Sequence, residues 1–143
     1  MKTILTAVMA QLKNEVPDLQ YIGEDWGQMD YYQDVPPVRF PCALVSISQV
    51  QYETVSKDSR RARITVQVRI ADSPRVAANV SAPDSYRERA FAIFELMDTV
   101  GAILNGLEGQ TFNRFKQQAV TRYNREDAIR EYSMTFQTGF LLE

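Results

Sequence analysis

The stretch RARITVQVRIA, residues 61–71, decides the fold because its polar and apolar side chains alternate from Arg61 to Ile70. Such alternation is typical of a β-strand that buries one face and exposes the other. The apolar set is Ile64, Val66, Val68 and Ile70, and the opposite set is Arg63, Thr65, Gln67 and Arg69. We therefore predict a half-buried strand whose polar face meets solvent or a neighbouring molecule.

A second long strand is expected directly before it. Residues 42–55 are rich in strand-forming residues, but their apolar positions change parity in the middle of the segment. Because a shift of one residue moves every side chain to the other face, we expect a β-bulge near Ser48 and Gln49. The polar residues 57–60 then form a turn, so the two strands make an antiparallel hairpin.

Apolar residues at helical spacing predict two helices. The first covers residues 3–16, with Thr3 as its cap and Pro17 ending it, since the residue before a proline avoids the α region. The second begins at Asp84 or Ser85, with Glu88 placed as in a capping box. Its apolar face continues to Leu107 and is wide enough to pack on a sheet.

Two further strands are expected over residues 115–123 and 131–142. The element order is then αββαββ, which favours an α+β fold: an antiparallel or mixed four-stranded sheet with two helices packed on one face and a long charged hairpin. We expect residues 1–143 to form a single domain. Its two long loops cover residues 18–41, which are acidic and aromatic, and residues 72–83.

Composition excludes several classes of function. The 143 residues include 16 basic and 18 acidic side chains, a net charge of −2, so the chain is no global polycation. It has no histidine, the commonest general base and transition-metal ligand. The one cysteine, Cys42, is expected to be a small core residue rather than a nucleophile. No segment is apolar enough to span a bilayer, so we expect no membrane partner.

Candidate acid–base pairs are present but have no pocket that the sequence defines. They are Glu24 with Asp25, Glu95 with Asp98, and Glu126 with Asp127. We interpret them as solvated surface charge, because acidic side chains are mostly exposed. Residues 23–27 have the spacing of neither a calcium loop nor a phosphate-binding loop. The sequence therefore predicts no catalytic, cofactor-binding or metal-binding residues.

Charge is segregated along the chain. Loop 18–41 is acidic, and residues 57–75 are basic through Lys57, Arg60, Arg61, Arg63, Arg69 and Arg75. Arg61, Arg63 and Arg69 share parity, so one strand face or its rim carries all three. This face carries no aromatic side chains, which disfavours a single-strand-binding sheet. It is either a solvated face or one of two complementary patches that join copies head to tail. The interface or lumen candidates are Arg60, Arg61, Arg63, Arg69, Glu24, Asp25, Asp30 and Asp34.

The layout resembles a family of virus proteins. An N-terminal helix and a Trp/Tyr-bearing loop lead into PVRFPCALV, residues 37–45, followed by a charged hairpin, a long helix and a C-terminal strand pair. This order is similar to the tail-terminator (tail-completion) proteins at the head–tail junction of tailed bacteriophages and prophages. The resemblance implies a non-enzymatic virion protein, located in the tail and assembled in the bacterial cytoplasm. It also implies a homo-hexameric ring that contacts the tail tube protein, the head–tail connector and, in passing, DNA in its lumen.

Two alternatives stay open from the sequence. One is a small-molecule-binding or enzymatic α+β domain with a pocket under the loop aromatics Trp26, Tyr31 and Tyr32. Aromatic rings in a long loop also serve as anchors that tie the loop to the core, because they bury a large area. The other alternative is an adaptor of the same fold in a phage-derived injection machine.

Overall fold

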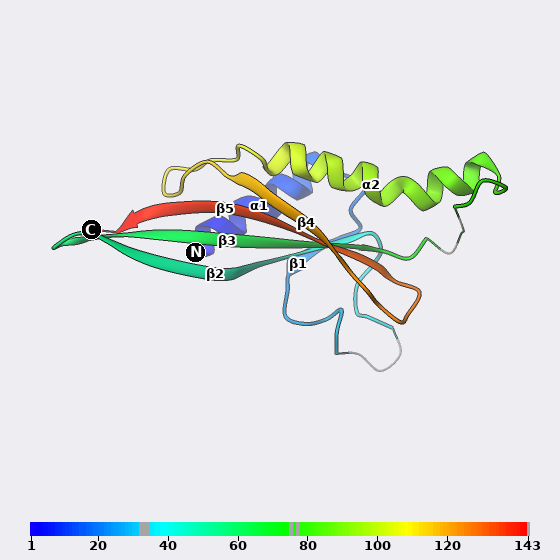
Figure 1. The fold of residues 1–143 in the computed structure, drawn as a ribbon, viewed down its shortest axis with the longest axis horizontal. Helices are drawn as coiled ribbons and strands as arrows, with labels where there is room; N and C mark the ends of the chain where they lie inside the picture. Colours follow the sequence, from blue (N-terminus) through cyan, green and yellow to red (C-terminus); the bar gives the residue numbers. More distant parts are fainter. Residues whose placement is uncertain (32–34, 75, 77, 143) are drawn as a thin grey trace.

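The computed structural model describes residues 1–31, 35–74, 76 and 78–142, and it is an α+β fold with both helices on one face of a single sheet (Figure 1). The predicted fold class is confirmed. The elements are α1 (Lys2–Glu15), β1 (Tyr21–Glu24), β2 (Cys42–Ser56), β3 (Ser59–Asp72), α2 (Asp84–Leu104), β4 (Lys116–Tyr123) and β5 (Arg130–Leu142). The strand order in the sheet is β1-β2-β3-β5-β4.

The sheet has five strands rather than the predicted four. The additional strand, β1, lies inside the predicted loop 18–41 and pairs in parallel with the start of β2, from Tyr21 beside Cys42 to Glu24 beside Val45. It is four residues long. A segment this short shows no clear alternation, and its pairing depends on a strand that starts about twenty residues later. The sheet is therefore mixed.

The long hairpin is confirmed, including its bulge. β2 and β3 pair from Cys42 opposite Ala71 to Ser56 opposite Ser59, and the register shifts between Ile47 and Gln49. Residues 51–58 are all exposed, because the hairpin extends beyond the two helices. We call this projection the arm: the hairpin residues 50–65 with the C-terminal end of β5, which pairs with β3 up to Leu142 (Figure 1).

The core lies between the helices and the sheet. The alternating apolar side chains of β3, from Ile64 to Ile70, are fully buried there, and Phe136 of β5 joins them. α1 contributes Ile4, Val8 and Leu12 to the same cluster. The second helix contributes Ala90, Ile93, Leu96, Met97, Val100, Gly101 and Leu104 to the buried face. Hydrophobic periodicity therefore identifies the buried face of β3 correctly. For α2 it is only partly right, because Phe91 and Phe94, expected on the packing face, are exposed, while Ile93 and Leu96 are buried.

The helix caps differ from the prediction. Met1 and Pro83 precede the first turns of α1 and α2, and neither helix start has a side-chain cap hydrogen bond. Asp84 and Ser85 lie within the first turn of α2, where Asp84 binds Arg87 instead. The predicted caps at Thr3 and at Asp84 or Ser85 are thus wrong, because the N-cap positions, Met1 and Pro83, precede these residues.

The edge strand β4 is fully exposed along its length and pairs only with β5 within the described sheet. The segment between α2 and β4 folds back on β5, since Asn113 donates its backbone N–H to the Gly139 carbonyl and Thr138 donates to the Asn113 carbonyl. Gly139 also lies tightly against β3, and a Cβ added there would lie 2.6 Å from the Ala62 carbonyl oxygen. This packing places Arg114 and Lys116 beside the arm.

Candidate functional site

Arg69 is the centre of an ion-pair network on the helix-free face of the sheet. Its Nη1 donates to Asp25 at 3.0 Å and to Asp30 at 2.9 Å, while its Nη2 donates to Asp30 at 2.9 Å and to Glu131 at 2.7 Å. The Arg69 side chain is 10% exposed and that of Glu131 is 2% exposed. A buried guanidinium with three carboxylates fixes the geometry of all the segments that carry them.

Arg125, in the turn between β4 and β5, completes this network. It donates to the Met29 carbonyl at 2.8 Å, to Asp127 at 2.7 Å and to Glu131 at 3.3 Å. The acidic loop is therefore clamped between β3 on one side and the β4–β5 turn on the other. We call Arg69, Arg125, Asp25, Asp30 and Glu131 the buried ion-pair network.

The network shifts two pKa values. The hydrogen bonds from Arg69 hold the pKa of Asp30 below the ordinary aspartate value, although partial burial opposes this shift. Burial alone would lower the pKa of the Arg69 guanidinium, but its hydrogen bonds to Asp30, Glu131 and Asp25 raise it above the ordinary arginine value. Both shifts favour the charged forms, so the loop is held by a charged pair at neutral pH.

The predicted exposure of Arg69 is wrong. It shares strand parity with Arg61 and Arg63, but the acidic loop of its own chain covers it, so it is 8% exposed. Asp25 and Asp30 are the residues that cover it. Glu24 is exposed at the end of β1, while Asp34 and Arg75 lie outside the described residues.

The remaining arginines of the arm point to opposite faces. Arg60 lies over the ring of Tyr52, with 5.1 Å between its guanidinium carbon and the ring centroid. Tyr52 pairs with the buried Ala62, which places Arg60 on the helix side of the arm. Neighbouring residues of a strand point to opposite faces, so Arg61 and Arg63 lie on the helix-free side.

The structure places two further cations, Arg114 and Lys116, beside Arg61 and Arg63, and the sequence analysis did not single them out. A cavity of about 250 Å³ beside the arm is lined by Arg61 and Arg63 together with Arg114 and Lys116. Lys116 pairs with Gln137 of β5, and Arg63 pairs with Gly139 two residues further along that strand. The register between β4 and β5 brings the four cations together. We call these four residues the basic cluster.

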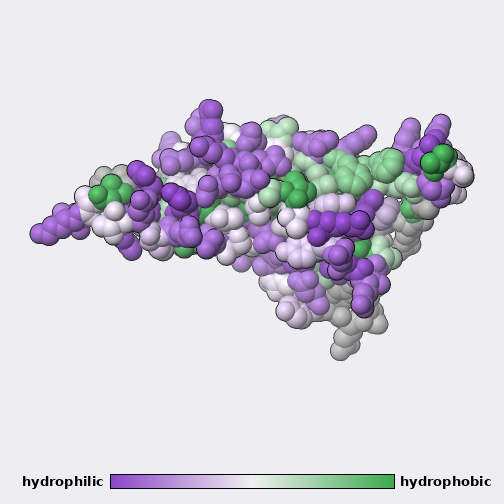
Figure 2. All heavy atoms as spheres, in the orientation of Figure 1, coloured by the Kyte–Doolittle hydropathy of each residue, from purple (hydrophilic) through white to green (hydrophobic). Residues whose placement is uncertain are grey.

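A group of exposed apolar side chains lies on the helix side, along α2 and the neighbouring edge strand. Phe91 is 49% exposed, Phe94 is 40% exposed and Val120 of β4 is 46% exposed. Val120 pairs with the buried Met134, so it points to the same side of the sheet as the helices. Figure 2 shows hydrophobic residues gathered over the α2 part of the surface. We call Phe91, Phe94 and Val120 the apolar patch.

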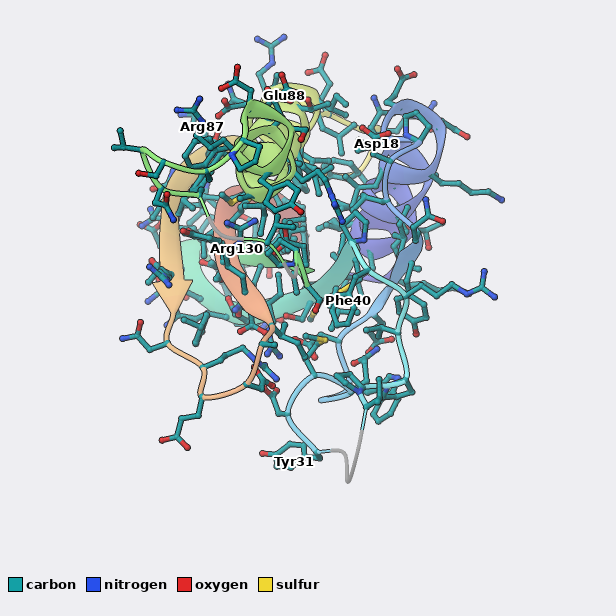
Figure 3. All side chains as sticks on the ribbon, turned by 90° about the vertical axis from the view of Figure 1, so that its right-hand side faces the viewer. Asp18, Tyr31, Phe40, Arg87, Glu88 and Arg130 are labelled. Atoms are coloured by element: carbon teal, nitrogen blue, oxygen red, sulfur yellow. The ribbon has the colours of Figure 1, made fainter. Side chains whose placement is uncertain are left out.

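Neither Trp26 nor Tyr31 lines any of the five best-formed cavities of the described residues. Trp26 is 64% exposed and Tyr31 is 84% exposed, while Tyr32 lies outside the described residues. Figure 3 shows Tyr31 at the outer end of its loop, beyond the sheet. A cavity of about 360 Å³ lies elsewhere, against the helices, and its walls include Phe40, Ile93 and Leu96. The predicted place of a pocket under these aromatics is therefore not supported.

Three observations concern chemical groups in the described part of the chain. Cys42 is fully buried, and burial raises the pKa of its thiol to about 12. No group of three or more His, Cys, Asp or Glu side chains within the described ranges could hold a metal ion. None of the helices traced in those ranges is long and apolar enough to cross a membrane.

Comparison with known proteins identifies a shared fold. No protein-family model and no curated protein matches this chain. Among solved structures, one chain of the virion of a native gene transfer agent particle matches with a TM-score of 0.56 and 15% sequence identity. The match covers 97% of this chain and 95% of that chain. At this identity the likeness is one of fold, and it extends over the whole domain.

Proposed function

We propose that this protein is a structural component of a phage or phage-like virion: a tail terminator that forms a homo-hexameric ring. The ring caps the tail tube and presents its other surface to the head connector. The observation that carries the proposal is the likeness over 97% of the chain to a chain of a gene transfer agent virion. The order of elements supports the tail-terminator role within that broader class. An adaptor of the same fold in a phage-derived injection machine is the related alternative.

The surface of the monomer offers two different patches, as a closed ring requires. A ring contact is heterologous, so one patch of each copy meets a different patch of the next. The apolar patch carries the exposed aromatics and lies beside the acidic outer side of α2, with Glu95 and Asp98. The helix side of the arm carries Arg60 on the exposed ring of Tyr52. We assign the ring contact to these two surfaces.

This assignment changes the role of the acidic loop. Asp25 and Asp30 are bound by Arg69 of the same chain, so their charges are compensated before any copy arrives. Acidic partners for Arg60 of a neighbouring copy are better provided by α2, whose residues 90–104 include two acidic and no basic side chains. The contact then combines exposed aromatic area with opposite charge around it.

The test is the solution mass by light scattering after size exclusion, at low and high salt. We expect a hexamer whose assembly weakens with salt, because exposed charge pairs are screened. Phe91→Gln should reduce assembly, whereas Val80→Gln, at a residue 93% exposed in the turn before α2, should leave it unchanged. A monomer at every salt and protein concentration would contradict spontaneous ring closure.

Two single substitutions separate an interface role from a lumen role. Because Arg60 and Arg61 point to opposite faces of the arm, Arg60→Glu should prevent ring formation while Arg61→Glu should leave rings intact. Both replace one positive charge by a negative one at exposed positions next to each other, so each is the control for the other. Equal loss of rings in both variants would refute the assignment of the contact to the helix side of the arm.

A further inference from the structure

The helix-free face of the sheet is a hydrated, hydrogen-bonding surface. Outside the buried ion-pair network, its side chains on the central strands are short polar or amide groups and cations. They are Ser46, Gln49, Gln51, Arg61, Arg63, Thr65, Gln67, Thr135 and Gln137, with Glu53 opposite Arg61. Protein interfaces are built around buried apolar anchors, and the side chains just named include none. Its chemistry suits a surface that meets water and a charged ligand.

The basic cluster forms a cationic cavity on this face. Arg61, Arg63, Arg114 and Lys116 line it together with the amides Asn113 and Gln137, and no carboxylate is among its lining residues. Gly139, which pairs with Arg63, has no side chain, so the space between the cations stays open. The one carboxylate within 4 Å of these cations in the described chain is Glu108. It lies 3.9 Å from Arg114, both side chains are about two-thirds exposed, and such a pair is weak.

We propose that the basic cluster binds the backbone phosphates of duplex DNA; this inference rests on the proposed ring, whose lumen the helix-free face would line. Arginine and lysine together with hydroxyl and amide side chains are the groups that contact DNA phosphates. Binding of single strands relies on aromatic stacking platforms, and the lining of this cavity has no aromatic ring. A duplex offers its charges on the outside and needs no stacking partner.

An acidic segment of protein is the competing occupant. The acidic loop of this chain already gives Asp25 and Asp30 to Arg69, at the opposite end of the same strand face. Six residues separate Arg63 from Arg69, which corresponds to about 20 Å along a strand. The cluster thus keeps its charge available when the loop of its own chain is in place.

The experiment measures binding of a fluorescein-labelled 20-base-pair duplex of mixed sequence by fluorescence anisotropy between 50 and 200 mM NaCl. The variants are Arg61→Gln/Arg63→Gln and, on different elements, Arg114→Gln/Lys116→Gln. The matched control is Lys2→Gln/Lys13→Gln, which removes the same charge from α1 on the other side of the sheet. Far-UV circular dichroism checks that each variant is folded, and light scattering on the same samples reports ring formation.

Each pair of lost phosphate contacts should flatten the slope of log K against log salt by about 1.8, which corresponds to about 60-fold weaker binding at 0.1 M salt. The control should change binding less than threefold. No binding by the wild type at 50 mM salt, or equal loss in the control, would overturn the inference. Tighter binding of the matching single strand than of the duplex would also overturn the inference. If the cluster variants fail to form rings but still bind the duplex as the wild type does, the occupant of the cavity is protein.

The readouts separate this inference from the proposed function. Rings that form but bind no duplex would overturn the DNA site and leave the ring intact. A monomer that binds duplex through the four cations would keep the site and contradict spontaneous ring closure.

Discussion

Replacement of Arg69 is the sharpest test of the buried ion-pair network. Arg69→Met keeps most of the side-chain length and removes the charge that Asp25, Asp30 and Glu131 share. The three carboxylates then repel one another, and Glu131, which is 2% exposed, loses its shortest ion pair. We therefore expect a large loss of stability, concentrated in the acidic loop.

The expected loss of stability depends on which ion-pair partners each carboxylate keeps after Arg69 is replaced. Removal of one partner from a buried ion pair costs about 3–5 kcal/mol. Here Glu131 keeps Arg125 at 3.3 Å, and the Asp30 side chain is 41% exposed, so its pair contributes little. The Arg69 Nε, which is buried without a hydrogen-bond partner, also no longer has to be desolvated. These offsets place the loss at the lower end, about 3 kcal/mol.

The assay is urea unfolding of Arg69→Met beside Arg61→Met, which changes the same residue type on the same strand and face but at an exposed position. Arg61→Met should change the free energy of unfolding by at most about 0.5 kcal/mol. Trp26, the only tryptophan, lies beside Asp25 and reports on the loop by its fluorescence. If Arg69→Met costs no more than Arg61→Met, the network does not hold the loop and the reasoning is refuted.

The pH dependence has a defined sign. The pKa of Asp30 is lowered in the folded state, so its pairing stabilises the protein above its ordinary value of 3.8 and is lost as pH falls below it. The wild type should therefore lose stability as the pH falls below about 4. Arg69→Met has already lost this pairing, so the difference in free energy of unfolding between the two proteins should narrow as the pH falls below about 4. A constant difference would show that Asp30 is not coupled to Arg69.

Two further predictions concern packing and the thiol. Gly139→Ala should destabilise the protein by about 1–3 kcal/mol, measured by urea unfolding, because the new Cβ would lie 2.6 Å from the Ala62 carbonyl oxygen of the neighbouring strand; an unchanged stability would show that the strands separate easily at this point. Cys42 should not react with a thiol reagent at pH 8 in the folded protein and should react fully in urea, since burial raises its pKa to about 12; fast labelling of the folded protein would contradict its burial.

The fold could be predicted largely because its determinants are local. Alternation over residues 61–71 and helical spacing from Ala90 to Leu104 each depend on one segment, and they identify the strand and the helix. The core face of β3 follows from the alternation, whereas the face of α2 was only partly found because Phe91 and Phe94 are exposed. The parity change near Ser48 even located the bulge. β1 could not be found this way, because its four residues become a strand only by pairing with Cys42–Val45. The helix starts were missed because the N-cap positions are Met1 and Pro83, which offer no polar side chain as a signal.

The site was less predictable because parity identifies a face but not what covers it. Arg61, Arg63 and Arg69 have the same parity, yet Arg69 is buried by a loop about 40 residues earlier and a turn about 60 residues later. That contact depends on β1, which places Asp25 beside β3. Arg114 and Lys116 were overlooked because they belong to no basic run in the sequence. The pairing of β4 with β5 brings them to the arm.

The distribution of charge after folding determines which ring contacts are reasonable. As a sequence, the chain suggests an acidic loop that meets a basic hairpin of the next copy. In the folded domain the loop and one arginine of that hairpin neutralise each other, and this pairing ties β1, β3 and the β4–β5 turn together. What stays available differs between the faces: the apolar patch, the acidic side chains of α2 and Arg60 lie on the helix side, and the basic cluster lies on the other. A contact between copies through the helix side leaves the basic cluster facing away from it. Under the proposed assignment, self-association and DNA contact therefore require different residues and can be separated by mutation.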